Sequence, residues 1–111
     1  MHLSIIVAGH PEKTPSSRSA VAFSEAAHAQ SCRIAHVFFL HDATWQAAML
    51  PDLAQRWIVL AEQTGCSLDL CITAAERRGL SEQSVYPGFE LRGLGQLVSA
   101  ALDSDRTVMF R

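Results

Sequence analysis

The chain has 111 residues, of which 49% are hydrophobic and 18% are charged. This balance excludes intrinsic disorder, and the length suits one domain, residues 1–111, that buries a real core. Nine basic and eleven acidic side chains leave a net charge of −2, without the basic stripe that binds nucleic acid directly. No apolar run reaches the roughly 18–20 residues that cross a bilayer. Three cysteines without a CxxC pair suit the reducing cytoplasm better than a disulfide framework.

Four largely apolar runs predict strands, of which the third is weaker because Asp69 interrupts it; a continuous apolar, β-branched run such as the first is typical of a strand covered on both faces. The four runs are residues 3–8, 34–40, 67–72 and 107–110, with a weaker fifth candidate at 89–91. The first run is too short for the apolar core of a signal sequence and lacks a basic leader, so it is read as a strand.

Apolar residues recur at helical spacing between these runs. Ser16-Ser17 is expected to cap the first helix, and Gly65 and Gly79 to end the second and third. The third helix is short, residues 74–78, and residues 81–87 are expected to form a loop. The longer helices are expected to bury, in chain order, Ala20, Phe23 and Ala27, then Leu53, Trp57, Leu60 and Ala61, then Leu94, Leu97, Val98, Ala101 and Leu102.

Strands that alternate with helices favour right-handed βαβ units and a parallel sheet between two helical layers. We therefore expect a three-layer, flavodoxin-like α/β domain with a mainly parallel sheet of four to five strands. A strand order of 2-1-3-4 would put the switch point, where ligands gather, between the first and third strands. The loops at 9–11 and 71–73 would then be neighbours, with His41-Asp42 one strand further out.

Cys71 is the strongest candidate for chemistry. It stands where the third strand meets a short helix, so that unpaired amides at the helix N-terminus can stabilise a thiolate. Arg77 and Arg78 add positive charge, although about 10 Å of helix separates Cys71 from Arg78. Alternatively, Cys71 is a small buried hydrophobic residue and the arginines cap a helix. Cys32 and Cys66 lie at strand beginnings, the opposite edge of the sheet, and are not expected to react.

His10 and His41 also follow strand ends, where either could accept a proton from a thiol or polarise a sulfur acceptor. A hydrolase built on Cys71, a histidine and Asp42 is conceivable, but the chain contains no nucleophile-elbow motif.

Metal and cofactor sites are not expected. The remaining histidines do not cluster with the cysteines at a spacing that binds zinc. Residues 93–98 superficially resemble a GxGxxG motif but lack its third glycine and the acidic residue that follows in dinucleotide sites. We interpret these glycines as a tight segment that packs near Cys71.

Four segments, in order along the whole chain, resemble the DsrE/TusD family of sulfur-relay proteins. The run CITAAERRG at 71–79 is similar to the family's segment from a cysteine to paired arginines and a glycine. The run VFFLHD at 37–42 resembles the family's VFFYHDG. Residues 88–97 match its GF-x-L-x-GLGQL element, and residues 105–108 its DR-x-V strand.

This resemblance implies that Cys71 is a sulfur carrier that accepts sulfane sulfur as a persulfide and passes it on. TusD-type members serve thiolation of the wobble uridine of certain tRNAs, and DsrE-type members serve dissimilatory sulfur oxidation. Both types work with upstream and downstream sulfur carriers, in an oligomer with DsrF/TusC-like and DsrH/TusB-like subunits. This chain departs from the family pattern in two segments that are shorter, residues 80–87 and the stretch before Leu53. It also has Leu40 where the family has tyrosine and Ala43 where the family has glycine.

Two other functions remain open on the sequence. The chain could be a non-catalytic structural subunit in which Cys71 is silent, or a flavodoxin-like module that binds a small molecule. In the sulfurtransferase interpretation, Cys71 carries the persulfide, and Arg77, Arg78, His10 and His41 support it.

Overall fold

The computed structural model, which describes residues 1–111, contains one wholly parallel five-stranded sheet. The strands are β1 (His2–Val7), β2 (Arg33–Phe39), β3 (Ser67–Cys71), β4 (Phe89–Arg92) and β5 (Arg106–Phe110). Every predicted strand, including the weaker fifth, is confirmed to within one residue at each end. The helices are α1 (Ser16–Ala29), the 3₁₀ helix η1 (His41–Ala47), α2 (Pro51–Thr64), α3 (Ile72–Arg77) and α4 (Leu94–Asp103).

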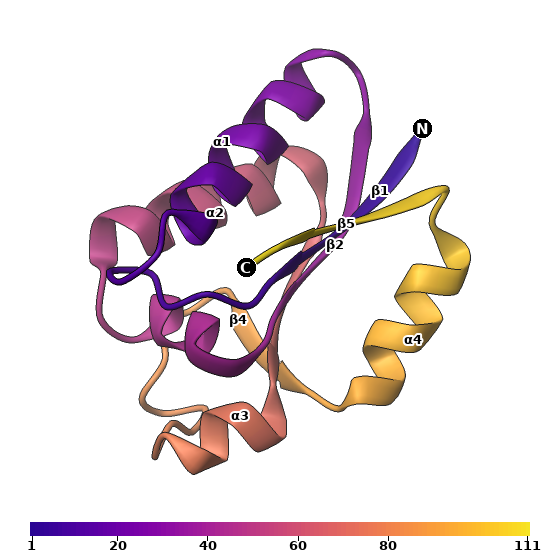
Figure 1. Cartoon of the computed structure of the whole chain (residues 1–111). Coiled ribbons are helices and arrows are strands. Elements are labelled where there is room, and N and C mark those ends of the chain that lie inside the picture. The colour runs from indigo at the N-terminus through magenta and orange to yellow at the C-terminus, as the bar shows by residue number, and fades with distance from the viewer.

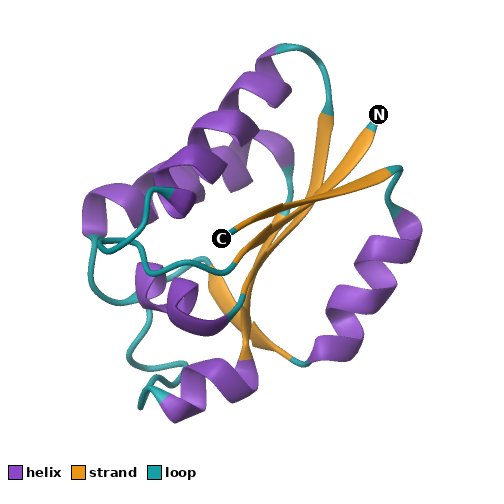
Figure 2. Cartoon of the chain, in the orientation of Figure 1, coloured by secondary structure: helices purple, strands orange, loops and turns teal.

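The helices divide between the two faces of the sheet (Figures 1 and 2). Helices α1 and α2 cover one face, α4 crosses the other, and α3 sits at the end of β3. This confirms the predicted three-layer α/β architecture. No helix combines the length and the apolarity that crossing a membrane requires.

The strand order is β4-β3-β2-β1-β5, so the expected order 2-1-3-4 is wrong. The chain steps outward from β1 to β4, and only the α4 connection returns across the sheet to place β5 beside β1. Right-handed crossovers in opposite directions put their helices on opposite faces, which explains why α4 lies apart from α1 and α2. Because β2 separates β1 from β3, His41-Asp42 lies next to the end of β3, and the loop at residues 9–11 lies further away.

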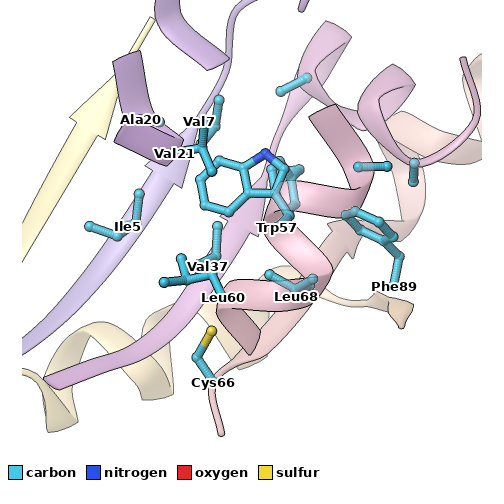
Figure 3. Close-up of a cluster of buried hydrophobic side chains, with 14 of the residues drawn as sticks. Ile5, Val7, Ala20, Val21, Val37, Trp57, Leu60, Cys66, Leu68 and Phe89 are labelled. Carbon is cyan, nitrogen blue, oxygen red and sulfur yellow. The ribbon is translucent and has the colours of Figure 1, made fainter. Parts of the chain in front are cut away.

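The main core fills the space between the sheet and the pair α1 and α2, with Trp57 near its centre (Figure 3). The Trp57 ring is fully buried and meets Phe39 edge-on, with ring centroids 5.2 Å apart. Its Nε1 donates a hydrogen bond of 2.6 Å to Oε1 of buried Gln46 in η1. The predicted stripe of α2 is therefore confirmed, and the helix ends as expected at Gly65, whose φ is +76°.

The start and the buried face of α1 differ from the prediction. Ser16 and Ser17 lie inside the helix and are buried, while Pro15 precedes it and no side chain caps it. Phe23 is 38% exposed and packs against Phe110, with ring centroids 5.6 Å apart. The residues that α1 buries are Ser16, Ser17, Ala20, Val21 and Ser24. Small residues thus face the sheet, since they allow close approach of the helix.

Helix α4 forms as predicted but buries none of its residues. Leu94, Val98 and Leu102 are 55%, 58% and 81% exposed. The expectation that this stripe packs into the core is therefore wrong for Leu94, Val98 and Leu102, whereas Leu97 is partly buried against Phe38, Cys71 and Ala74. Apolar periodicity identifies a helical stripe, but it does not say whether that stripe meets the rest of its own chain or faces outward.

Candidate active site

A pocket of about 620 Å³ opens at the carboxyl ends of β2 and β3. Its walls come from the start of η1, the turn between β3 and α3, the end of α3, and the beginning of α4. The lining residues are Leu40, His41, Asp42, Cys71, Thr73, Ala74, Arg77, Arg78 and Leu94. The pocket thus collects five residues that the sequence singled out, and it does not include His10.

Cys71 is the last residue of β3 and the residue that immediately precedes α3. The helix begins at Ile72 rather than at the predicted Ala74, so the change from strand to helix occurs at the cysteine itself. Cys71 is 6% exposed and packs against Phe38 and Ala74, yet it borders the pocket. It is therefore well ordered by packing and still adjoins an open cavity.

Arg78 reaches the pocket by folding back along α3. Its Nη1 donates a hydrogen bond of 2.9 Å to the carbonyl oxygen of Ala74, and Nε and Nη2 donate to Oδ1 of Asp42 at 3.0 and 2.8 Å. Hydrogen bonding from Arg78, opposed by some desolvation, lowers the pKa of the Asp42 carboxyl. The long side chain of Arg78 thus folds back along α3, and both Arg78 and Cys71 line the pocket.

Arg77 ends α3 and lines the same pocket. It takes part in no ion pair or side-chain hydrogen bond of the chain. Its positive charge is therefore unpaired within the protein and can face an anionic group in the pocket. Arg78, by contrast, is already paired with Asp42.

The two candidate histidines are placed differently. His41 opens η1, lines the pocket and adopts a left-handed backbone, with φ of +50°. His10 lies in the loop after β1, where its Nδ1 accepts a 3.0 Å hydrogen bond from the amide of Glu12. Its link to the site is electrostatic, as a minor contribution to the lowered pKa of Asp42.

The segment at the start of α4 borders the site, as predicted, but its glycines are not tightly packed, because a side chain at Gly93 or Gly95 would meet open space. Leu94 lines the pocket, and Leu97 packs against the small cluster of Phe38, Cys71 and Ala74. This segment therefore closes one side of the cysteine's surroundings.

The other two cysteines lie away from the pocket. Cys66 precedes β3 and belongs to the main core, and burial raises the pKa of its thiol. Cys32 precedes β2 and is partly buried. All three thiols are free, and Cys71 alone among them borders the cavity.

Sequence reasoning did not identify Asp69, a buried acidic residue of β3 two positions before Cys71, as part of the surroundings of the site. Asp69 is 2% exposed, contacts His36, lies within ion-pair distance of Arg92, and accepts a 2.7 Å hydrogen bond from the Ser67 hydroxyl. The available signal was an aspartate in an otherwise apolar strand, two positions before the cysteine. A buried carboxylate at such a place requires partners, because an isolated charge is costly to bury.

Comparison with known sequences connects this geometry to one family. The model of the DsrE/DsrF-like family matches residues 1–110. A protein named sulfurtransferase TusD from Serratia proteamaculans is 36% identical over 124 residues, covering 96% of each chain. The sulfurtransferase TusD of Cronobacter sakazakii is 31% identical over 128 residues, covering 99% of this chain and all of the relative. Both alignments are longer than the 111 residues here, so these relatives contain residues without a counterpart in this chain.

Solved structures share the fold. The ychN protein of E. coli superposes with a TM-score of 0.85 at 19% identity, over 99% of each chain. The protein of unknown function MTH1491 from Methanobacterium thermoautotrophicum gives a TM-score of 0.80 at 12% identity, over 96% of this chain and 97% of its own. At these identities the likeness concerns the architecture alone.

Proposed function

This chain belongs to the DsrE/DsrF-like family and acts as a sulfurtransferase in a sulfur relay, and we propose that Cys71 is the residue that carries the sulfur. The observation that supports this assignment is that Cys71 alone among the three cysteines borders the pocket, together with two arginines. A sulfur carrier needs a thiolate that a partner can reach, and nearby positive charge favours the thiolate.

The proposed transfer balances without an outside oxidant or reductant. The Cys71 thiolate attacks the outer sulfur of a persulfide on the donor protein, so that a new S–S bond forms on Cys71. The S–S bond of the donor breaks, and the donor leaves as a thiolate with the electron pair. The proton stays on the transferred sulfur or passes to solvent. A downstream thiolate then attacks the Cys71 persulfide in the same way.

The lining residues would serve this transfer by their charge and position. Arg77, which has no partner in the chain, faces the anionic sulfur, and Arg78 holds the rim of the pocket by binding Asp42. His41 lies in the pocket wall, where an imidazole can exchange the proton of an incoming persulfide. His10 acts only from outside, through its electrostatic effect on Asp42.

A relay requires partner proteins, and we propose that they are an upstream and a downstream sulfur carrier and homologous DsrF/TusC-like and DsrH/TusB-like subunits. The exposed stripe of α4, formed by Leu94, Val98 and Leu102, supports this proposal. Leu94 belongs both to the stripe and to the pocket wall, so a subunit seated on α4 would border the cysteine. We place the relay in the cytoplasm, because a carrier thiol must stay reduced between transfers.

Mass spectrometry tests the assignment directly. After incubation with a cysteine desulfurase and cysteine, the wild-type chain should gain about 32 Da per sulfur, and the adduct should lie on Cys71. Cys71→Ser should abolish it, whereas Cys32→Ser should retain it as the matched control. A wild-type chain that stays unmodified while its Cys71 thiol is free would favour a non-catalytic subunit. An adduct confined to another cysteine would also reject the proposal.

A further inference from the structure

The face of the sheet that carries Cys71 also carries a row of charged side chains. Residues i and i+2 of a strand point to the same face, so Asp69 and Cys71 are neighbours on β3, about 7 Å apart along the strand. On β4, Glu90 is in register with Asp69, and Arg92 is in register with Cys71. Arg92 is therefore the residue directly opposite the cysteine in the parallel ladder.

Two carboxylates meet across this pair of strands, an arrangement that is unfavourable unless cations offset it. Arg92 supplies a cation to both of them. Its Nε lies 3.8 Å from Oδ1 of Asp69, and its Nη2 contacts Oε2 of Glu90. From β2, Nε2 of His36 contacts the other Asp69 oxygen without an aligned hydrogen bond.

A negatively charged sulfur on Cys71 would be a third anion beside these two carboxylates. At about 7 Å and an effective dielectric constant near 20, one unneutralised carboxylate disfavours a neighbouring anion on the order of tenfold after solvent screening. Asp69 matters more than Glu90 here, because its side chain is 3% exposed whereas that of Glu90 is 60% exposed. The thiolate and the persulfide anion therefore depend on how well Asp69 is neutralised.

We propose that Arg92 is a positioning residue for sulfur transfer, which neutralises Asp69 and Glu90 from the strand opposite Cys71 so that the sulfur there can be negatively charged. This inference rests on the proposed role of Cys71 as the sulfur carrier. Arg92 differs from Arg77 and Arg78 because it does not line the pocket and acts from the sheet side.

The pH dependence of Cys71 alkylation by iodoacetamide, read at residue level by tandem mass spectrometry, tests this role in the intact chain. Arg92→Gln should slow alkylation at pH 7 on the order of fivefold and move the half-maximal rate to higher pH by roughly half a unit or more. Arg92→Lys should retain most of the rate. Arg33→Gln, which removes an exposed arginine at the start of β2, is the matched control and should leave the profile unchanged.

The second-site variant distinguishes electrostatics from folding. Asp69→Asn added to Arg92→Gln should restore the alkylation rate, because it removes the carboxylate that Arg92 neutralises. Asp69→Asn alone should move the alkylation profile to lower pH. If Arg92→Gln does not fold, this single variant is used to test the inference. The other charged groups around the sulfur are the same in all variants: His36, His41, Asp42, Arg77, Arg78 and Glu90.

The outcomes separate this inference from the proposed function. If folded Arg92→Gln and Asp69→Asn both reproduce the wild-type alkylation profile, Arg92 only pins β4 to β3 and the inference is overturned. Alkylation needs no sulfur donor, so the profile can respond to Arg92 even in a chain that never accepts sulfur. An alkylation profile that responds to Arg92→Gln, in a chain whose Cys71 gains no sulfur, would reject Cys71 as the carrier and keep the electrostatic coupling between Arg92 and Cys71.

Discussion

Arg78 and Asp42, 36 positions apart in the sequence, form a two-pronged ion pair across the edge of the pocket, with distances of 3.0 and 2.8 Å to one carboxylate oxygen. A further bond from Arg78 to the carbonyl oxygen of Ala74 ties the same guanidinium to α3. The ion pair therefore joins η1, which follows β2, to the helix that follows Cys71. The width of the pocket depends on a side-chain contact as well as on the backbone.

Replacing Asp42 by Asn should destabilise the fold in a pH-dependent way. Arg78 lowers the pKa of Asp42 in the folded state, so the ion pair contributes stability above the ordinary value of 3.8, and this contribution is lost as the pH falls through the lowered value. The Asp42 side chain is 51% exposed, so the loss at pH 7 should be at most about 1 kcal/mol.

Urea unfolding of the wild type and the Asp42→Asn variant, at pH 7 and again below the lowered pKa of Asp42, measures this effect. The two proteins should differ at pH 7 and converge in acid. Asp103→Asn, at an exposed aspartate without an ion pair, is the control. Its difference in unfolding free energy from the wild type should not shrink in this way when the pH falls. A difference between wild type and Asp42→Asn that persists unchanged in acid would contradict the expected role of the ion pair.

Cys66 should behave as a core residue. It is 8% exposed, and burial raises the pKa of its thiol, so the neutral form predominates at pH 7. Cys66→Ser should cost about 1–2 kcal/mol of unfolding free energy, because it buries a hydroxyl in an apolar cluster. Sulfur loading of Cys71, followed by mass spectrometry, should be unaffected in the folded protein. Equal stability of the serine variant in denaturant titrations would refute this view of Cys66.

Trp57→Phe should cost about 2 kcal/mol or more, since it leaves Oε1 of buried Gln46 without its 2.6 Å hydrogen bond. Chemical denaturation gives the difference in unfolding free energy. The double variant Trp57→Phe/Gln46→Met removes the unpaired oxygen and should recover part of the loss. If the double variant is no more stable than Trp57→Phe, the cavity left by the indole, and not the unpaired amide, dominates.

Val98→Asp should prevent assembly with homologous subunits while leaving the chain folded. Val98 is 58% exposed at the middle of the α4 stripe, so a charge there faces solvent in the isolated protein but would be buried in an interface. Size-exclusion chromatography with light scattering, on the chain co-expressed with the proposed DsrF/TusC-like and DsrH/TusB-like subunits, measures assembly. Ser99→Asp, at an exposed neighbour off the stripe, is the matched control. Assembly that survives Val98→Asp would exclude this face as the interface.

The amino-acid sequence alone determined the features that depend on neighbours along the chain. Largely apolar runs predicted four strands and a weaker signal the fifth, and helical spacing with Gly65 predicted α2 and its end. It also placed Cys71 at the end of a strand and the segment at 93–97 close to it. These features follow from side-chain periodicity and from the backbone freedom of glycine, which act over a few residues.

Only the tertiary structure decided which segments lie side by side. A strand's own sequence does not say which strands become its neighbours, so only the folded sheet gives the order β4-β3-β2-β1-β5, which brings His41 and Asp42, rather than the loop at 9–11, to Cys71. The register of β4 then places Arg92 opposite the cysteine. Such pairings depend on contacts between residues far apart in the chain, which form through the packing of the whole sheet and its helices.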